Sequence, residues 1–215
     1  MKQGNSLFTW LLRTFWIGGF ALQFWLSKLE THRVLNAYHH PAMDTVMRYM
    51  TFLGDGIVAV LVSMLFMLNS VKRGLVLLLA FLVSGGIVQF IKNFVVPKAM
   101  RPMHYFEYDE TFYKIADFTY FYHQSFPSGH AATTFAIATV LAHFYPKIKS
   151  QLFIFVGALI IAYTRIYLSQ HFLLDVLAGS MIGYFVAHYL VEWLLPLMTF
   201  EDKSLLSTFN KSKNP

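Results

Sequence analysis

The chain has 215 residues, of which 56% are hydrophobic and only 13% are charged. A soluble domain carries about a quarter charged residues, so this composition indicates an integral membrane protein with little length left for a soluble domain. The net charge of +6 is modest and falls largely in short segments between apolar runs, which is typical of membrane topology rather than of nucleic-acid binding. The absence of cysteine excludes disulfides and thiolate metal sites.

Six apolar runs predict an all-α polytopic protein, with six transmembrane helices in one bundle. Each run is near the roughly 20 residues that a helix needs to cross the hydrocarbon. The first run could also be read as a signal peptide, but it is long and bulky and no small-residue cleavage site follows it before Lys28. We therefore expect an uncleaved first span, followed by a short interfacial helix and a turn at Pro41 before the second. The expected spans are residues 7–26, 52–68, 75–96, 127–145, 152–168 and 173–195.

Six spans place both ends of the bundle's chain on one side of the membrane. Lysine and arginine in short loops mark the cytoplasmic side, and those on the terminal side are Lys2, Lys72, Arg73, Lys147, Lys149, Lys203, Lys211 and Lys213. The aromatic, acidic loop 98–126 and the connection between the last two spans then meet on the outer face. We expect one membrane domain over residues 1–200 and a polar, disordered tail over 201–215.

The stretch Ser125–His130 connects the wet outer loop to the fourth apolar run. Pro127 has no backbone N–H and suits the first turn of a helix. Ser128 and Gly129 then offer a hydroxyl and free N–H groups at a helix N-terminus, which favours anions. His130 adds an acid or a base at the same place. These residues predict an anion site, although a capping serine followed by a buried histidine also occurs for structural reasons.

Two further polar clusters lie at the same predicted face. His171 and Asp175 are four residues apart, so on a helix they share a face, and a carboxylate beside an imidazole fixes its tautomer. Arg101 and Lys92 flank the outer end of the third run, where they could grip a phosphate. The structural alternatives are a His–Asp pair that joins helices and cations that extend to the membrane surface.

In order along the chain, these clusters resemble the three-part signature of the type 2 phosphatidic acid phosphatase family. The matching residues are Lys92 with Arg101-Pro102, then Pro127-Ser128-Gly129-His130, then Arg165 with His171 and Asp175. Two departures stand out. Eight residues separate Lys92 from Arg101 where the family usually has six, so Lys98 is a rival for the lysine role. Thr164 precedes Arg165 where the family usually has serine.

The resemblance implies metal-free hydrolysis of a lipid phosphate or pyrophosphate. It implies that His171 is the nucleophile of a phosphohistidine intermediate, that Asp175 orients His171, and that His130 is the general acid and then the base. The phosphoryl oxygens would be held by Lys92, Arg101, Arg165, Ser128 and Gly129. No cofactor and no metal ligand are expected, because positive charge and positioning dominate phosphoryl transfer. Asp55 could support this site, but capping of a helix is the favoured interpretation.

Several questions stay open at this point. The partner would be a membrane lipid phosphate such as undecaprenyl pyrophosphate, phosphatidylglycerophosphate, phosphatidic acid or lipid A 1-phosphate, and the sequence does not choose among them or between hydrolase and phosphotransferase. The size suggests a bacterial inner-membrane enzyme whose site faces the periplasm or exterior. A transporter could use the same charges as an ion path, and a soluble haloperoxidase could carry similar motifs. The oligomeric state is not indicated.

Overall fold

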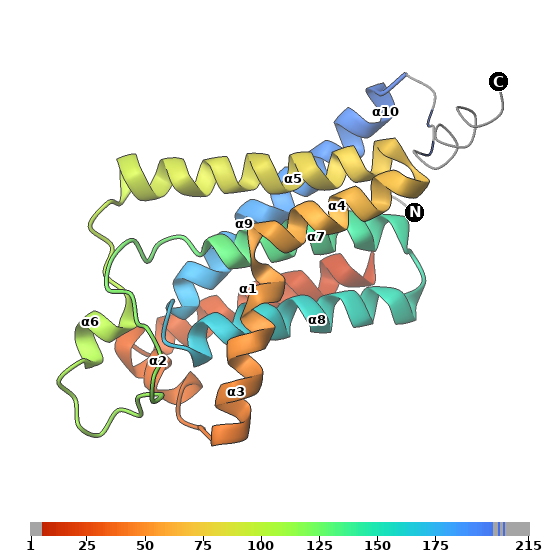
Figure 1. Cartoon of the computed structure of the whole chain (residues 1–215). Helices are drawn as coiled ribbons and strands as arrows, with labels where there is room; N and C mark the ends of the chain where they lie inside the picture. Colours follow the sequence, from red (N-terminus) through yellow and green to blue (C-terminus); the bar gives the residue numbers. More distant parts are fainter. Residues whose placement is uncertain (1–5, 200–201, 203, 205–215) are drawn as a thin grey trace.

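The computed structural model describes residues 6–199, 202 and 204, and this part of the chain is helical without any strand (Figure 1). The N-terminal elements are α1 (Leu7–Trp25), α2 (Lys28–Leu35), α3 (Pro41–Met50), the 3₁₀ turn η2 (Thr51–Gly54) and α4 (Gly56–Asn69). Next come α5 (Val71–Phe90), its π-helical end η3 (Ile91–Val95) and the short α6 (Pro102–Phe106). The last elements are α7 (Gly129–Phe144), α8 (Ile148–Tyr167), α9 (Leu173–Tyr189), the π-helical η4 (Leu190–Leu194) and α10 (Leu195–Leu197).

Helix α7 is the centre of the bundle. It packs against α9, α5 and α8, and these helices run side by side in Figure 1. Its buried residues are alanines and threonines together with Phe135 and Val140. Small side chains let helices approach closely in a membrane, where the apolar effect between helices is weak. The sequence of α7 therefore suits a helix that is enclosed by protein.

Two glycines on α9 make the closest of these contacts. A Cβ at Gly179 would lie 2.3 Å from the carbonyl oxygen of Ser128, and one at Gly183 would lie 2.2 Å from that of Ala132. The two glycines are four residues apart, which is the small-xxx-small spacing of close helix pairs. This contact fixes the N-terminus of α7 beside the start of α9.

The C-terminal end of α8 is held by the segment between the first and second apolar runs. Asn36 donates hydrogen bonds to the carbonyl oxygens of Ile166 and Tyr167, at 2.9 and 2.7 Å. The Tyr167 hydroxyl donates to Asp44 at 2.6 Å. Since Arg165 precedes these residues by one and two positions, the network also positions its backbone.

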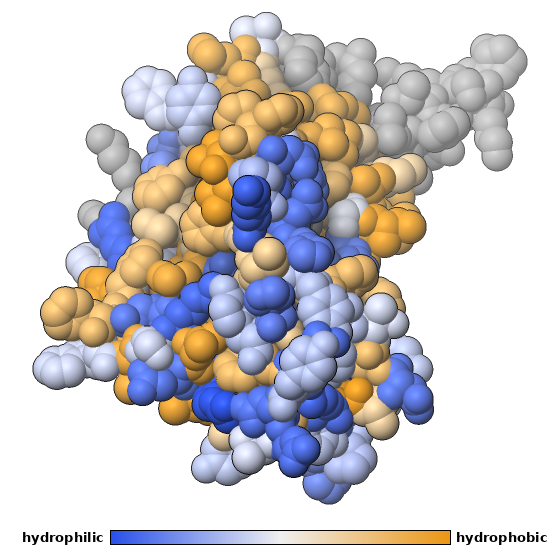
Figure 2. All heavy atoms as spheres, turned by 90° about the vertical axis from the view of Figure 1, so that its left-hand side faces the viewer, coloured by the Kyte–Doolittle hydropathy of each residue, from blue (hydrophilic) through white to orange (hydrophobic). Residues whose placement is uncertain are grey.

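One end of the bundle is polar. Helices α2, α3 and α6 and the loop before α7 gather there, while α1 begins and α10 ends at the opposite end (Figure 1). Figure 2 views this polar end and shows hydrophilic residues over much of it, with hydrophobic residues along its upper edge. The arrangement places the loop and the α8–α9 connection on one face.

The all-helical fold class is confirmed, but the number of spans is not. By length and composition the described part has three helices that could cross a membrane: Val71–Val95, Ile148–Tyr167 and Leu173–Leu197. The pair Pro41–Gly54 and Gly56–Asn69, bent by 56°, would make a fourth. Helix α7, with 16 residues, is shorter than these candidate spans, and other helices enclose it. These helices make the chain an integral membrane protein.

Several predicted boundaries were wrong. Pro41 opens α3 rather than making a turn, so two short helices follow α1 in place of one. Pro127 follows a cis peptide and lies outside α7, which begins at Gly129. The predicted tail, residues 201–215, lies outside the described residues except for Asp202 and Ser204. Asp202 accepts hydrogen bonds from Ser70 and from the Lys72 backbone at the start of α5.

Candidate active site

A histidine and a carboxylate meet at the α8–α9 connection. His171 precedes α9 and Asp175 lies in its first turn, and His171 Nδ1 is 3.4 Å from Asp175 Oδ2. The same oxygen accepts hydrogen bonds from the Phe172 backbone at 2.9 Å and from Ser125 Oγ at 2.5 Å. With Nδ1 engaged, Nε2 is the ring nitrogen of His171 that is left for chemistry. Burial of His171 lowers its pKa to about 3, so the ring is neutral at physiological pH.

The start of α7 lies against this pair. Ser128 is the N-cap of α7, where its buried hydroxyl accepts from the Ala131 N–H at 3.4 Å. Its own backbone N–H donates to the Asp175 carbonyl oxygen at 2.9 Å. The capping role occupies the Ser128 hydroxyl, whereas Gly129 follows as the first helical residue. The positive end of the α7 dipole therefore points toward the His171–Asp175 pair.

Arg165 supplies a buried cation from the last turn of α8. Its side chain is buried, and one terminal nitrogen donates to the Thr51 hydroxyl at 2.5 Å. Its Nε has no hydrogen-bond partner within the part of the chain that the structure describes. A buried donor without an acceptor is costly, so this guanidinium fits an anion that is bound during function.

Arg101 approaches from the outer loop. Its Nε donates to the His123 carbonyl oxygen at 2.7 Å, and Nη1 donates to the backbone oxygen and side-chain oxygen of Gln170 at 3.0 and 3.1 Å. These carbonyls fix the plane of the guanidinium next to His171. Burial lowers the pKa of Arg101 from its ordinary value.

Lys92 lies in the π-helical end of α5 and is buried, whereas Lys98 is exposed in the following turn. The charges of Arg101, Asp175 and Arg165 all act on Lys92. The structure thus brings Lys92, and not Lys98, to the other cations.

His130 lies among these charges in the first turn of α7. The charges of Arg165, His171, Lys92 and Arg101 all act on its ring. Its Nε2 is 2.7 Å from Asp55 Oδ1. Asp55 occupies the N-cap position of α4, but its side chain makes no capping hydrogen bond. The helix-capping interpretation of Asp55 was therefore wrong.

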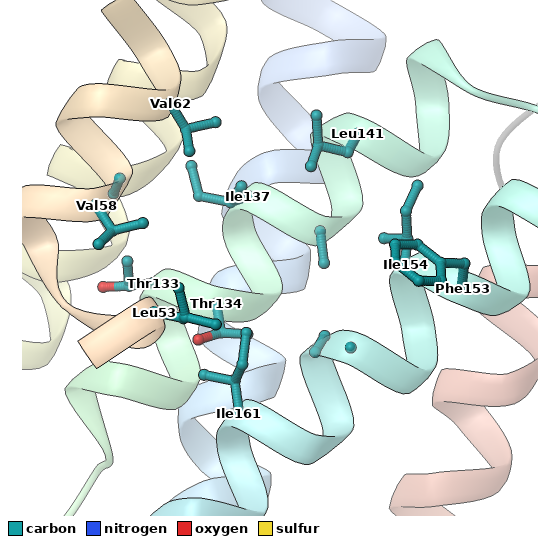
Figure 3. A pocket seen from close by; sticks show the side chains of 14 residues that line it. Leu53, Val58, Val62, Thr133, Thr134, Ile137, Leu141, Phe153, Ile154 and Ile161 are labelled. Carbon is teal, nitrogen blue, oxygen red and sulfur yellow. The ribbon is translucent and has the colours of Figure 1, made fainter. Parts of the chain in front are cut away.

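Two hollows lie along the N-terminal half of α7, and His130 lines the first of them. The first, of about 340 Å³, is lined by Asp55, His130, Gly129 and the Gly85-Gly86 pair of α5. The second, of about 220 Å³, is an apolar crevice between α4, α7 and α8, where Figure 3 shows Leu53, Thr134 and Ile161 close together. The Gly54–Gly56 turn lines the first hollow, and Leu53 and Val58, on either side of that turn, line the second.

The fold and this cluster define an integral membrane enzyme of the phosphatase class: a helical bundle with two histidines, a buried His–Asp pair and three cations at one polar end. The family model described as the PAP2 superfamily matches residues 73–198, which are more than half of the chain. The chain belongs to the PAP2 superfamily.

Individual relatives agree with this membership. The chain is 40% identical over 76 residues to a lipid A 4'-phosphatase of Bacteroides thetaiotaomicron, a match that covers 32% of this chain and 34% of that protein. The matched stretch thus spans about a third of that relative. Among solved structures, LpxE of Aquifex aeolicus superposes with a TM-score of 0.66 at 29% identity, over 77% of this chain and 94% of that one.

A second solved structure shares the fold. It is a transmembrane PAP2 type phosphatidylglycerolphosphate phosphatase from Bacillus subtilis, with a TM-score of 0.60 and 18% identity, covering 88% of this chain and 98% of that one. At this identity the likeness concerns the fold alone.

Sequence reasoning missed several residues of the cluster. Ser125 holds Asp175, Gln170 holds Arg101, and Thr51 holds Arg165. Ser125 lies in the same short stretch as Ser128 and His130, and Gln170 directly precedes His171. Their positions in the sequence could therefore have identified them as candidates. Thr51 comes from a distant turn, and no local pattern marks it.

Proposed function

We propose that this chain hydrolyses a phosphate monoester or pyrophosphate carried by a membrane lipid, without a metal ion, through a phosphohistidine intermediate. The observation that carries the proposal is the convergence of His171–Asp175, His130 and three cations within the residues that match the family. Phosphoryl transfer depends mainly on positioning and on positive charge around the three phosphoryl oxygens. This cluster offers both.

In the first half of the reaction, His171 Nε2 attacks phosphorus and the bond to the leaving oxygen breaks. Asp175 holds Nδ1, which fixes the tautomer and stabilises the charge that develops on the ring. Protonated His130 gives its proton to the leaving oxygen. In the second half, His130 takes a proton from water, whose oxygen attacks phosphorus and releases His171.

The cations have distinct parts in this scheme. Arg165, with its unpaired Nε, and Arg101 present planar donors to the phosphoryl oxygens, and Lys92 adds a point charge. The N–H of Gly129 at the start of α7 adds a dipolar donor. Since the Ser128 hydroxyl caps α7, its contribution to phosphate binding is expected to be small until substrate displaces that bond.

Among these substrates, a lipid A phosphate is the first candidate because of the Bacteroides relative. Undecaprenyl pyrophosphate and phosphatidylglycerophosphate remain in the panel of substrates. The apolar crevice between α4, α7 and α8 supports a lipid substrate, because its lining can accept hydrocarbon.

We place the site on the outer face of a bacterial inner membrane, in a six-span arrangement whose α1 and α7 also cross the bilayer. The lysines and arginines of the opposite end support this orientation. The same placement argues against a transporter, since an ion path needs charges at the midplane, and here they gather at the polar end of the bundle. A phosphotransferase would use the same phosphoenzyme and differ only in the acceptor.

The experiment is phosphate release by purified protein in detergent with EDTA present, from a panel of the lipids named above. We expect activity on at least one lipid that survives EDTA and is inhibited by vanadate, which mimics pentacoordinate phosphorus. Loss of activity in EDTA that magnesium restores would contradict the metal-free mechanism. Release of no phosphate from any lipid would contradict the function.

A matched pair of variants tests the lysine. Lys92→Met should lower kcat/KM by roughly 10²-fold or more, because a buried cation of the proposed phosphate site would be lost. Lys98→Met removes the same charge from the exposed turn and should leave the rate within about twofold. The reverse ranking would assign the first motif to Lys98.

A further inference from the structure

Asp55 lies where the chain changes direction between η2 and α4, a bend of 56°. Its backbone occupies the N-cap position of α4, yet its carboxylate leaves the helix unbonded and reaches across to α7. An aspartate at an N-cap normally accepts from the helix N–H groups. Because the Asp55 carboxylate does not bond to α4, its position must be determined by a contact outside that helix.

The reason is the contact with His130. Asp55 Oδ1 lies 2.7 Å from His130 Nε2, which is the length of a charge-assisted hydrogen bond. The Asp55 side chain is 34% exposed and that of His130 is 26% exposed, so both face the hollow of about 340 Å³. The pair is therefore accessible to a substrate and is not a sealed structural bridge.

The two flanking glycines make this approach possible. A Cβ at Gly54 would lie 3.1 Å from Thr134 Oγ1 and 3.2 Å from His130 Cδ2. A Cβ at Gly56 would lie 2.7 Å from the ring of Phe81. Side chains at these two positions would press on α7 and on Phe81 of α5, so the glycines let Asp55 lie close to both helices.

The surroundings of His130 oppose its protonation, and the Asp55 carboxylate can offset this effect. The groups that act on the ring are Arg165 from α8, His171 from the α8–α9 connection, Lys92 from η3 and Arg101 from the outer loop. Burial of the ring and all of these charges disfavour an imidazolium. A general acid must nevertheless carry the second proton before the leaving oxygen departs. Within the described chain, Asp55 is the carboxylate that contacts this ring.

We propose that Asp55 is the positioning residue of His130: its carboxylate holds Nε2–H and stabilises the imidazolium, so that Nδ1 gives the proton to the leaving oxygen and later takes one from water. The assignment mirrors the first pair, where Asp175 holds Nδ1 of His171 and leaves Nε2 to attack. The proposal rests on the proposed function for the acid–base role of His130. Each proton that leaves Nδ1 in the first half returns in the second, and Asp55 is not consumed.

The kinetic test is a double-mutant cycle in the full-length protein, with a lipid monophosphate as substrate. Asp55→Asn keeps the shape of the side chain and removes its charge. We expect kcat to fall roughly 10–100-fold with little change in KM, and the alkaline limb of kcat to move to lower pH, because loss of the carboxylate favours the neutral ring. In a His130→Ala background, Asp55→Asn should cause no further loss.

Asp109→Asn, in the outer loop where Asp109 pairs with Arg33, is the matched control and should keep wild-type kinetics. Asp55→Glu, which restores the charge, should recover part of the activity. Thermal midpoints of all variants in detergent separate misfolding from the kinetic effect. Wild-type kcat in Asp55→Asn, or an equal loss with and without His130, would overturn the proposal and make Asp55 a structural residue or a stand-in for bound substrate.

A second measurement needs no substrate. ¹⁵N NMR of histidine-labelled protein, with the His130 signal assigned by its loss in His130→Gln, reports the pKa and the tautomer of that ring. Asp55→Asn should lower the pKa of His130 and weaken the preference for a proton on Nε2, and an unchanged titration would overturn the pairing. If the wild type releases phosphate from no lipid while NMR shows the coupling, the proposed function fails and the pair stands.

Discussion

At the scale of single residues, the two histidines of the site differ in which ring nitrogen is engaged. His171 is held at Nδ1 by Asp175, and His130 is held at Nε2 by Asp55. His171 is enclosed, whereas His130 borders a hollow. The enclosed ring of His171 suits a nucleophile that reacts only with phosphorus of a bound substrate. The ring of His130, beside the hollow, suits proton exchange with a leaving group and with water.

This difference predicts separate phenotypes for the two alanine variants. His171→Ala should form no covalent phosphoenzyme and should lose nearly all turnover, because a whole chemical step is removed. His130→Ala should lower kcat roughly 10²–10⁴-fold when the leaving group is an alkoxide. The decrease should be smaller with a pyrophosphate lipid, because its leaving group depends less on protonation. Rapid-quench trapping of radiolabelled phosphoenzyme measures both. Phosphoenzyme in His171→Ala would show that the roles are assigned wrongly.

At the scale of elements, the site depends on how closely α9 approaches α7. Gly183→Ala would place a Cβ 2.2 Å from the Ala132 carbonyl oxygen, which no side-chain rotation can relieve. Overpacking of this kind costs roughly 1–3 kcal/mol, and the helices must separate, which moves Ser128 away from Asp175. We expect a lower thermal midpoint in detergent together with a loss of kcat.

The matched control for that change is Gly18→Ala in α1. No atom lies within 4 Å of the added methyl group there, and the residue is exposed. Alanine favours a helix by up to about 1 kcal/mol over glycine, so stability should hold or rise and activity should be unchanged. Equal effects of the two substitutions would mean that the α7–α9 contact is not the cause.

The elements also show what could be predicted from the sequence. The contact between His171 and Asp175 follows from local spacing, although it arises at a helix N-terminus and not on a helix face. The Asp55–His130 contact depends on a 56° bend and on two glycines that admit the turn, and a one-dimensional pattern contains neither. The apolar runs predict six spans. Helix α7 has only 16 residues, so length and composition alone do not identify it as a span, and the number six remains a prediction.

At the scale of the whole molecule, two buried histidines make stability depend on pH. Burial lowers the pKa of both His32 and His171 to about 3. Asp175, His39 and Lys28 are the other charges that act on His32. Both rings fold neutral and protonate when unfolded, so their stabilisation is full above pH 6.5 and is lost as the pH falls toward 3. Within that window, each of the two rings lowers the free energy of unfolding by about 1.4 kcal/mol for every unit by which the pH falls.

His32→Gln tests this linkage away from the reacting groups. When the pH is lowered from 7.5 to 5.5, the thermal midpoint of the wild type should decrease. The midpoint of His32→Gln should decrease by less, and the difference should be roughly 2–4 °C for each kcal/mol of pH-dependent stability that the substitution removes. The variant can be less stable at pH 7.5, since His32 stacks on Phe106 and Phe112, so the slopes and not the midpoints are compared. Equal slopes would mean that His32 is already protonated in the folded protein.

The orientation of the whole bundle can be tested because the chain has no cysteine. Asp109→Cys places a thiol in the outer loop at the polar end, and Ser150→Cys places one at the start of α8, at the opposite end. The distribution of lysine and arginine predicts that the first end is outside. An impermeant maleimide added to intact cells should therefore label Asp109→Cys at once and Ser150→Cys only after the cytoplasm is opened. The reverse pattern would put the cation cluster on the cytoplasmic face, where its lipid phosphate would have to come from the inner leaflet.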